Sequence, residues 1–300
     1  MKIALCISGQ PRNLDQCFPH FEKVFLNNKN IQVDVFAHIW WDKEYEGKTY
    51  MWHSTAKFEK EDLGKKFLQM FRPKSYKIEK QKQFDLSFCK QHNMNWLDPS
   101  LPQKQLDIFT PGALFCVMSQ SYSIWQSDIL RQNSKEEYDL VIRARTDTVF
   151  SGEVDYTQVL SHLKKNPDDV LWQNSMHGGP QYGGEFPNSP CDWFCVALPD
   201  TMSRLTYQWH NSVPEHYENG VIHIKEHVHK ITEKANASLS SAQFYAHMYR
   251  KNDGNPHEFR EVTNYWEDFD SKTGEIKNRK EEWPFWAEKI DFARLAEGED

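Results

Sequence analysis

Short apolar segments alternate with amphipathic segments along most of the chain. Segments with the β-branched and aromatic composition of strands cover residues 2–8, 32–41, 75–80, 138–150, 169–173 and 192–198. Segments whose apolar residues recur at spacings of three and four cover residues 14–26, 59–71, 111–132, 156–165 and 240–251. Strands that alternate with helices are typical of an α/β protein. The pattern therefore predicts an α/β fold with a parallel sheet flanked by helices.

The predicted strand at 138–150 begins apolar and becomes charged near its end. Arg143, Arg145 and Asp147 alternate at the two-residue period of a strand, so the pattern places all three on one face. Ligands of open α/β sheets bind at the carboxyl ends of strands. Two interpretations fit this spacing. One is an internal Arg–Asp salt bridge that closes the strand, and the other is a diphosphate site in which a carboxylate holds Mg²⁺ or Mn²⁺ beside arginines.

Further candidates follow the first two predicted strands. Ser8 and Gln10 offer hydrogen-bonding side chains, Gly9 permits close backbone approach, and Arg12 can pair with a phosphate. The same Ser-Gly-Gln-Pro-Arg composition is also typical of an ordinary turn. His38, near the end of the second strand, is a candidate for the nucleotide pocket, although residues there often belong to the core.

Asp192 follows a segment rich in glycine and proline at 177–190. A mobile segment beside a carboxylate suits a transfer reaction, because a base must deprotonate the acceptor while water is kept out. Asp192 is therefore a general-base candidate, and the alternative is an Asx turn that opens a strand.

Three histidines, His223, His227 and His229, lie within one short segment. Three such residues can bind zinc, but Lys225 and Glu226 interleave them as on a solvated helix face. The spacing favours the solvated face.

Composition excludes several classes of protein. The 36 Lys and Arg against 43 Asp and Glu give a net charge of -7, which lacks the basic footprint of a non-specific nucleic-acid-binding protein. We find no long apolar stretch and no signal peptide, so the sequence predicts a cytoplasmic protein with no membrane span. The six cysteines show no paired CxxC motif and are expected to be free thiols.

Four segments in order carry a resemblance to a known family. They are Ser8-Gly9-Gln10-Pro11-Arg12, the strand at 33–40, the strand at 138–147 with its Arg-x-Arg-x-Asp, and Asp192-Trp193-Phe194. Together they resemble nucleotide-sugar glycosyltransferases of the GT-A type, most closely a bacterial and large-phage group. The resemblance implies transfer of a sugar from a UDP- or GDP-sugar to a hydroxyl of a saccharide acceptor. The alternative is a carbohydrate- or nucleotide-binding protein that keeps the scaffold without catalysis.

The resemblance also implies roles for individual residues. Asp147 takes the second place of the Asp-x-Asp motif that binds Mn²⁺ or Mg²⁺ and the donor, but the first place holds Thr146 or Arg145, so one carboxylate is present. Either Asp147 holds the metal with fewer protein ligands, or Arg143 and Arg145 neutralise the diphosphate instead.

The resemblance covers roughly residues 1–200 and implies the Rossmann-like form of the fold, with a mixed, mostly parallel sheet flanked by helices. We expect residues 1–250 to form the catalytic domain, with a nucleotide-binding half at 1–150 and an acceptor half at 151–250. We expect residues 251–300, which the resemblance does not cover, to form a loop-rich, acceptor-side extension packed on the core. Aromatic residues make up 14% of the chain, and flat apolar rings stack on sugars. At least one of four tryptophans is expected to contact the acceptor: Trp193, Trp266, Trp283 and Trp286.

Overall fold

The computed structural model describes residues 1–48, 57–84, 111–151, 154–174, 190–218, 224–241 and 245–248. The strands in these residues are β1 (Lys2–Gly9), β2 (Gln32–Trp40), β3 (Ser75–Glu79), β4 (Leu140–Arg145), β5 (Thr148–Ser151), β6 (Asp169–Asn174), β7 (Pro190–Ala197), β8 (Ser238–Ser241) and β9 (Tyr245–Met248). The helices are α1 (Leu14–Phe21), α2 (Leu63–Phe71), α4 (Pro111–Asn133), α5 (Tyr156–Lys165), α6 (Pro199–Asn211), α7 (Val213–Glu218) and α8 (Ile224–Lys234), with short helical turns η1 (Glu22–Leu26) and η2 (Lys43–Tyr45).

Seven of the described strands form one sheet in the order β3-β2-β1-β4-β7-β6-β8. The pairs on both sides of β1 are parallel, as are β2 with β3 and β6 with β8. Strand β7 runs antiparallel to both of its neighbours, β4 and β6. The prediction of an α/β protein with a mixed, mostly parallel sheet is confirmed.

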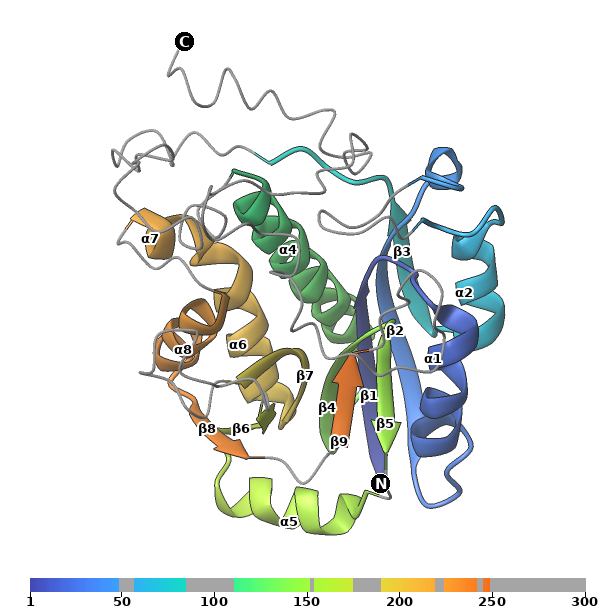
Figure 1. The fold of residues 1–300 in the computed structure, drawn as a ribbon. Helices are drawn as coiled ribbons and strands as arrows, with labels where there is room; N and C mark the ends of the chain where they lie inside the picture. The colour runs from blue at the N-terminus through green and yellow to red at the C-terminus, as the bar shows by residue number, and fades with distance from the viewer. Residues whose placement is uncertain are drawn as a thin grey trace, which may run out of the picture.

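Helices cover both faces of this sheet (Figure 1). Alternate residues of β1 divide between the two faces: Ile3, Leu5 and Ile7 belong to the apolar core shared with α1, α2 and α5. Ala4 and Cys6 belong to a second core shared with α6 and α8. Because β1 is buried on both faces, its sequence is an almost continuous apolar run, as expected of a central parallel strand.

The segment at 138–150 is not the single strand that its composition predicts. It forms β4 and then, after a turn at Thr146 and Asp147, β5, which pairs with β9 in a separate two-stranded sheet. Phe150 of β5 packs edge-on against Phe21 and Phe25 on the α1 side of the main sheet. The break follows from contacts of the turn with the loop after β1, which a strand-like composition does not reveal.

The helix predicted at 240–251 is wrong. This segment contributes β8, which pairs in parallel with β6, and β9, which pairs with β5. Its apolar residues have helical spacing, but pairing with distant strand edges overrides the local pattern. Helices α6 and α7 were not predicted, although Met202, Leu205 and Trp209 of α6 recur at spacings of three and four and are fully buried.

Several sequence predictions fall outside the described residues. These are nearly all of the loop at 177–190, the extension at 251–300, and Trp266, Trp283 and Trp286. Cys6, Cys17, Cys116 and Cys195 are free thiols, as predicted. Within the described ranges no helix combines the length and the apolar composition that crossing a bilayer requires.

A buried ionic network joins α4 to α6 beneath the sheet. Asp128 is fully buried and accepts hydrogen bonds from Arg131 Nε at 2.7 Å, Gln132 Nε2 at 2.7 Å and the Thr206 hydroxyl at 3.0 Å. Arg131 in turn donates to Ser203 Oγ at 2.5 Å. Asp128, Arg131 and Thr206 are buried, whereas Gln132 is exposed. Loss of the Asp128 charge therefore leaves the buried Arg131 charge without compensation.

We therefore expect Asp128→Asn to lower the free energy of unfolding by roughly 3 kcal/mol, because it leaves the Arg131 charge buried without its carboxylate. Urea denaturation measures this loss. A matched control is Asp168→Asn, which breaks the exposed pair between Asp168 and Arg204 and should cost about 1 kcal/mol or less. Equal losses in the two variants would contradict the assignment.

Candidate functional site

The carboxyl ends of β1 and β4 meet at the point where the order of strands in the sheet reverses. From β1 the chain adds β2 and β3 on one side and then returns to place β4 on the other side. Ser8 of β1 lies in register with His38 of β2 and with Arg145 of β4. These three residues form a polar row at the end of strands that are otherwise apolar. In open α/β sheets this reversal is the usual place for a ligand.

A buried ion cluster closes this end of the sheet. Arg145 donates from Nε and Nη2 to the two carboxylate oxygens of Asp147, at 2.9 and 2.8 Å, in a bidentate pair. The Nη2 atom of Arg12 lies 3.4 Å from Asp147 Oδ2. The Asp147 side chain is 1% exposed and each arginine side chain is 13% exposed. We call Arg12 and Arg145 the guanidinium pair; both are oriented by the same carboxylate.

The Thr146 side chain joins the loop after β1 to the same turn through backbone groups of the loop. The Thr146 hydroxyl donates to the carbonyl of Gln10 at 2.5 Å, and the Arg12 amide lies 3.4 Å from Thr146 Oγ1. Gly9 has φ +114°, a conformation that residues with a Cβ rarely adopt, and it turns the chain into this loop. The predicted loop residues thus lie beside Asp147, and Gln10 contributes through its carbonyl.

The structure brings together two of the three charged residues of the Arg-x-Arg-x-Asp motif and separates the third. Arg143 is 1% exposed, and its guanidinium lies 5.2 Å from the centre of the Trp209 ring on α6. It is in register with Cys6 of β1 and Cys195 of β7, within the second apolar core. Arg143 shares a strand face with Arg145, as predicted. It lies two residues further from the carboxyl end of β4, however, where α6 covers the sheet.

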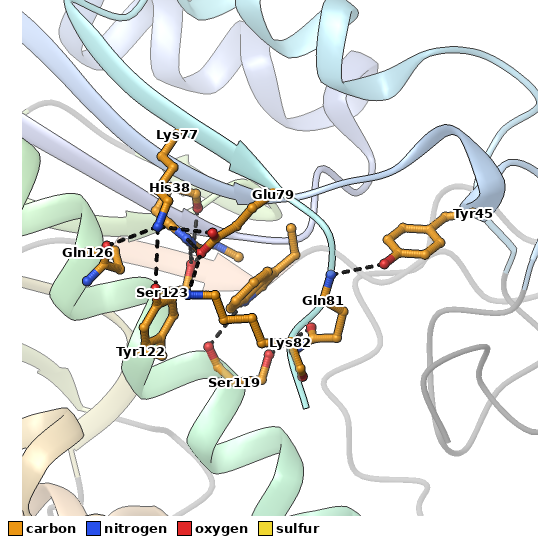
Figure 2. Close-up of polar contacts among 12 residues, drawn as sticks. His38, Tyr45, Lys77, Glu79, Gln81, Lys82, Ser119, Tyr122, Ser123 and Gln126 are labelled. Carbon is orange, nitrogen blue, oxygen red and sulfur yellow. Dashed lines mark hydrogen bonds and ion pairs between the residues drawn. The ribbon is translucent and has the colours of Figure 1, made fainter. Parts of the chain in front are cut away.

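His38 belongs to a hydrogen-bonded network that we call the histidine network (Figure 2). Its Nδ1 lies 2.8 Å from Ser123 Oγ on α4, and its Nε2 lies 2.9 Å from Glu79 Oε1 at the end of β3. The Gly9 amide donates to Ser123 Oγ at 2.9 Å. The network therefore connects the exit of β1 with the exits of β2 and β3, as Figure 2 allows the reader to follow.

The outer end of the histidine network is cationic. Lys77 Nζ lies 3.0 Å from Glu79 Oε2, and Lys82 Nζ lies 3.5 Å from Glu79 Oε1. Both ammonium groups also contact the Tyr122 hydroxyl, and Lys82 lies over the Tyr122 ring, 4.2 Å from its centre. Two cations and one carboxylate thus lie at the rim, with the neutral imidazole inside.

Burial keeps His38 neutral. Removal from water lowers the pKa of His38 to about 4, even though its hydrogen bond to Glu79 acts in the opposite direction. Burial alone raises the pKa of Glu79, but hydrogen bonds from His38 and Lys77 outweigh it and bring that pKa to about 2. We assign the imidazole proton to Nε2, facing Glu79, which leaves Nδ1 as an acceptor. The Ser123 hydroxyl has one proton, and both Nδ1 and the His38 carbonyl, 3.1 Å from Ser123 Oγ, lie within hydrogen-bond distance of it.

Asp192 lies on β7 at the same edge of the sheet. Phe194 is in register with Ala144 and β7 is antiparallel to β4, so the amino-terminal end of β7 accompanies the carboxyl end of β4. The side chain of Asp192 lies outside the described residues. Trp193 is partly buried and packs against the core on the α1 side, and nothing described places it against an acceptor.

The residues present do not fit a divalent cation at Asp147. Both of its carboxylate oxygens already accept from the Arg145 guanidinium, and a cation there would face two positive groups at close range. Among the described residues, Asp147 does not gather with other ligating side chains into a group of three. The expected metal site is therefore not supported by the arrangement of its one predicted ligand.

One group of three possible ligands does occur in the described residues, at Asp15, Glu59 and Glu61. The Lys66 ammonium lies among them, 2.7 Å from Asp15 and 2.6 Å from Glu61, and 3.6 Å from Glu59. An internal cation thus already neutralises this cluster. His227 and His229 lie on α8, but their side chains and all of His223 are outside the described residues.

Sequence reasoning gave no role to two residues of this site, Ser123 and Glu79, and it weighed Thr146 only as an occupant of the Asp-x-Asp place. Ser123 lies on the helix whose apolar stripe drew attention to its other residues, and it is fully buried. Its burial and its contacts with the ends of the strands are seen only in the folded structure, so the sequence offered no signal for it.

Comparisons with known proteins add no identity to this geometry. No model of a protein family matches the chain, and no curated protein matches it either. The function must therefore be argued from the site.

We expect Ser123→Ala to lower the free energy of unfolding by roughly 1 to 3 kcal/mol, because the Gly9 amide and His38 Nδ1 both lose a buried partner. Ser127→Ala is the matched control on the same helix. Ser127 is equally buried, but its hydroxyl bonds to the Ile124 carbonyl one turn earlier, so its loss should cost little. Urea denaturation of both variants is the measurement, and equal costs would contradict the network.

Stability should also depend on pH between about 6.5 and 4. In this window the unfolded chain protonates His38 and His210, while burial lowers the pKa of each to about 4 in the folded protein. The unfolded state then binds more protons, so the free energy of unfolding falls as pH falls, by up to about 1.4 kcal/mol per pH unit for each histidine.

Urea denaturation at pH 7, 6 and 5 measures this dependence. His210→Gln should reduce the slope and leave the parts due to His38 and to His216, whose pKa burial also lowers. A free energy of unfolding that stays constant across the window would contradict the burial of neutral His38.

Proposed function

We propose that this protein is a glycosyltransferase that moves a sugar from a nucleotide-sugar donor to a hydroxyl group of a saccharide acceptor. The observation that carries the proposal is the guanidinium pair, Arg12 and Arg145, held by Asp147 at the reversal point of the sheet. Cationic forks at this place suit the diphosphate of an activated sugar.

Three further features support this choice. The strand order and the small β5–β9 sheet are compatible with the GT-A fold that the sequence resembles. The loop from Gly9 to Arg12 follows the central strand, where a nucleotide would be held. Asp192 lies on the strand that accompanies β4 at the same edge.

The proposed reaction needs two groups from the protein. Asp192 takes the proton from the acceptor hydroxyl as its oxygen attacks the sugar carbon. The bond from that carbon to the diphosphate oxygen breaks, and the electron pair leaves with the nucleoside diphosphate. The guanidinium pair stabilises the charge that develops on this leaving group. For transfer with retention of configuration, Asp192 positions the acceptor instead.

A non-catalytic protein that binds nucleotides or carbohydrates is the second candidate. The Arg145–Asp147 pair favours it, because a carboxylate already bonded at both oxygens to an arginine does not supply the metal ligand expected of the resemblance. Calorimetry with UDP and GDP, followed by a turnover assay, separates the two functions. Binding without turnover of any donor would favour the second.

We expect the wild-type protein to release UDP or GDP from a nucleotide sugar when a saccharide acceptor is present. Asp192→Asn should lower this turnover at least about 100-fold, as loss of a general base does, while UDP or GDP still raises the melting temperature as in the wild type. Asp200→Asn, at an exposed aspartate in the first turn of α6, is the control and should retain turnover. Full activity of Asp192→Asn would remove the base from the mechanism.

A further inference from the structure

Asp147 contacts two arginines, and within the part of the chain that the structure describes it does not join other metal-ligating side chains in a group of three. Its two oxygens lie 2.8 and 2.9 Å from Arg145 nitrogens, and the Oδ2 atom also lies 3.4 Å from Arg12. A bidentate carboxylate–guanidinium pair is strong and fixes the plane of the guanidinium. At 1% exposure of Asp147, little water is available to weaken it.

We propose that Asp147 is a positioning residue for Arg12 and Arg145, and that these two arginines bind the donor diphosphate without a divalent cation. The inference rests on the proposed function in taking the ligand to be a nucleoside diphosphate. Of the two alternatives that the resemblance left open, it takes the one in which arginines neutralise the diphosphate, and not the one in which Asp147 holds Mn²⁺ or Mg²⁺. It also assigns to Arg12 the diphosphate-binding role that the resemblance gave to Arg143, because Arg143 lies under α6 against Trp209.

The two arginines come from different elements, and both are fixed before a ligand arrives. Arg145 ends β4, and Arg12 lies in the loop that Thr146 fastens through the Gln10 carbonyl. Their side chains are 13% exposed, so both guanidinium groups have lost most of their contact with water before an anion binds. A pre-oriented cation loses little rotamer entropy on binding, which is the advantage that a positioning carboxylate provides.

The test uses inorganic pyrophosphate and UDP as probes, measured by isothermal titration calorimetry on the full chain. Protein stripped with EDTA should bind both probes with dissociation constants within about twofold of those measured with Mn²⁺. Arg145→Gln should weaken both at least about tenfold, since it removes a charge-assisted fork. Arg204→Gln removes the same charge from an exposed Arg–Asp pair on α6 and should leave both constants unchanged.

Arg145→Gln leaves Asp147 buried beside a neutral side chain and can fail to fold. The double variant Arg145→Gln/Asp147→Asn removes both charges and keeps a hydrogen-bonded pair of similar shape. It should fold by circular dichroism and still bind pyrophosphate at least about tenfold more weakly than the wild type. Arg145→Lys keeps the positive charge but lacks the forked guanidinium. Its dissociation constant for pyrophosphate should lie between those of the wild type and of the double variant.

A direct measurement of Mn²⁺ completes the test. Electron paramagnetic resonance of added Mn²⁺ should show the same bound fraction for the wild type and for Asp147→Asn. Binding of the probes only with Mn²⁺, no binding of pyrophosphate, or a loss of bound Mn²⁺ in Asp147→Asn would each overturn the inference. If the probes bind without metal but no nucleotide sugar is turned over, the proposed glycosyltransferase activity is refuted and the metal-free binding site is not. If turnover depends strictly on Mn²⁺, the proposal of metal-free binding by the guanidinium pair is refuted and the proposed activity is not.

Discussion

The bidentate pair between Arg145 and Asp147 determines how the centre of this protein is arranged. It ends β4, turns the chain into β5, and sets the carboxylate that Arg12 meets from the loop after β1. Thr146, between the two paired residues, then fastens the Gln10 carbonyl. Two parallel strands that are adjacent in the sheet but far apart in sequence are thus joined at their carboxyl ends by side chains of a single turn.

The histidine network performs a comparable task one strand further along. Ser123 accepts from the Gly9 amide and meets His38, and His38 meets Glu79, so three strand exits depend on one helix. The imidazole is neutral because burial lowers its pKa to about 4. A neutral histidine can accept on one side and donate on the other, and a charged one cannot. The loop that carries Arg12 is therefore held by Ser123 of α4, through the Gly9 amide, as well as by the turn after β4.

Much of the fold could be predicted from sequence, because local periodicity reports burial directly. The apolar run of β1 and the spacing in α5 predict their elements well. The division of 138–150 into β4 and β5, and the strands at 238–248, could not be predicted. Both depend on partners distant in sequence: Gln10 for the turn, and β6 for β8.

The candidate site was predicted in part for the same reason. Strand periodicity gives Arg143 and Arg145 one face, but Asp147 meets Arg145 from the turn after β4 rather than from the strand. Periodicity also carries no information on depth. Arg143 lies two residues earlier, where α6 covers the sheet and Trp209 meets it. Arg12 could be suspected from its loop, yet its contact with Asp147 requires the parallel register of β1 and β4. Ser123 carries no signal outside the folded structure.

Buried ions of this kind are rarely a source of stability. Withdrawing a carboxylate and two guanidiniums from water costs several kcal/mol, and well-packed apolar side chains often replace such sets without loss. A charged cluster retained at the end of strands that are otherwise apolar is better explained by a task that apolar side chains cannot perform. Holding cations in place for an anionic ligand is such a task. In this task the carboxylate orients the arginines and does not bind a metal ion.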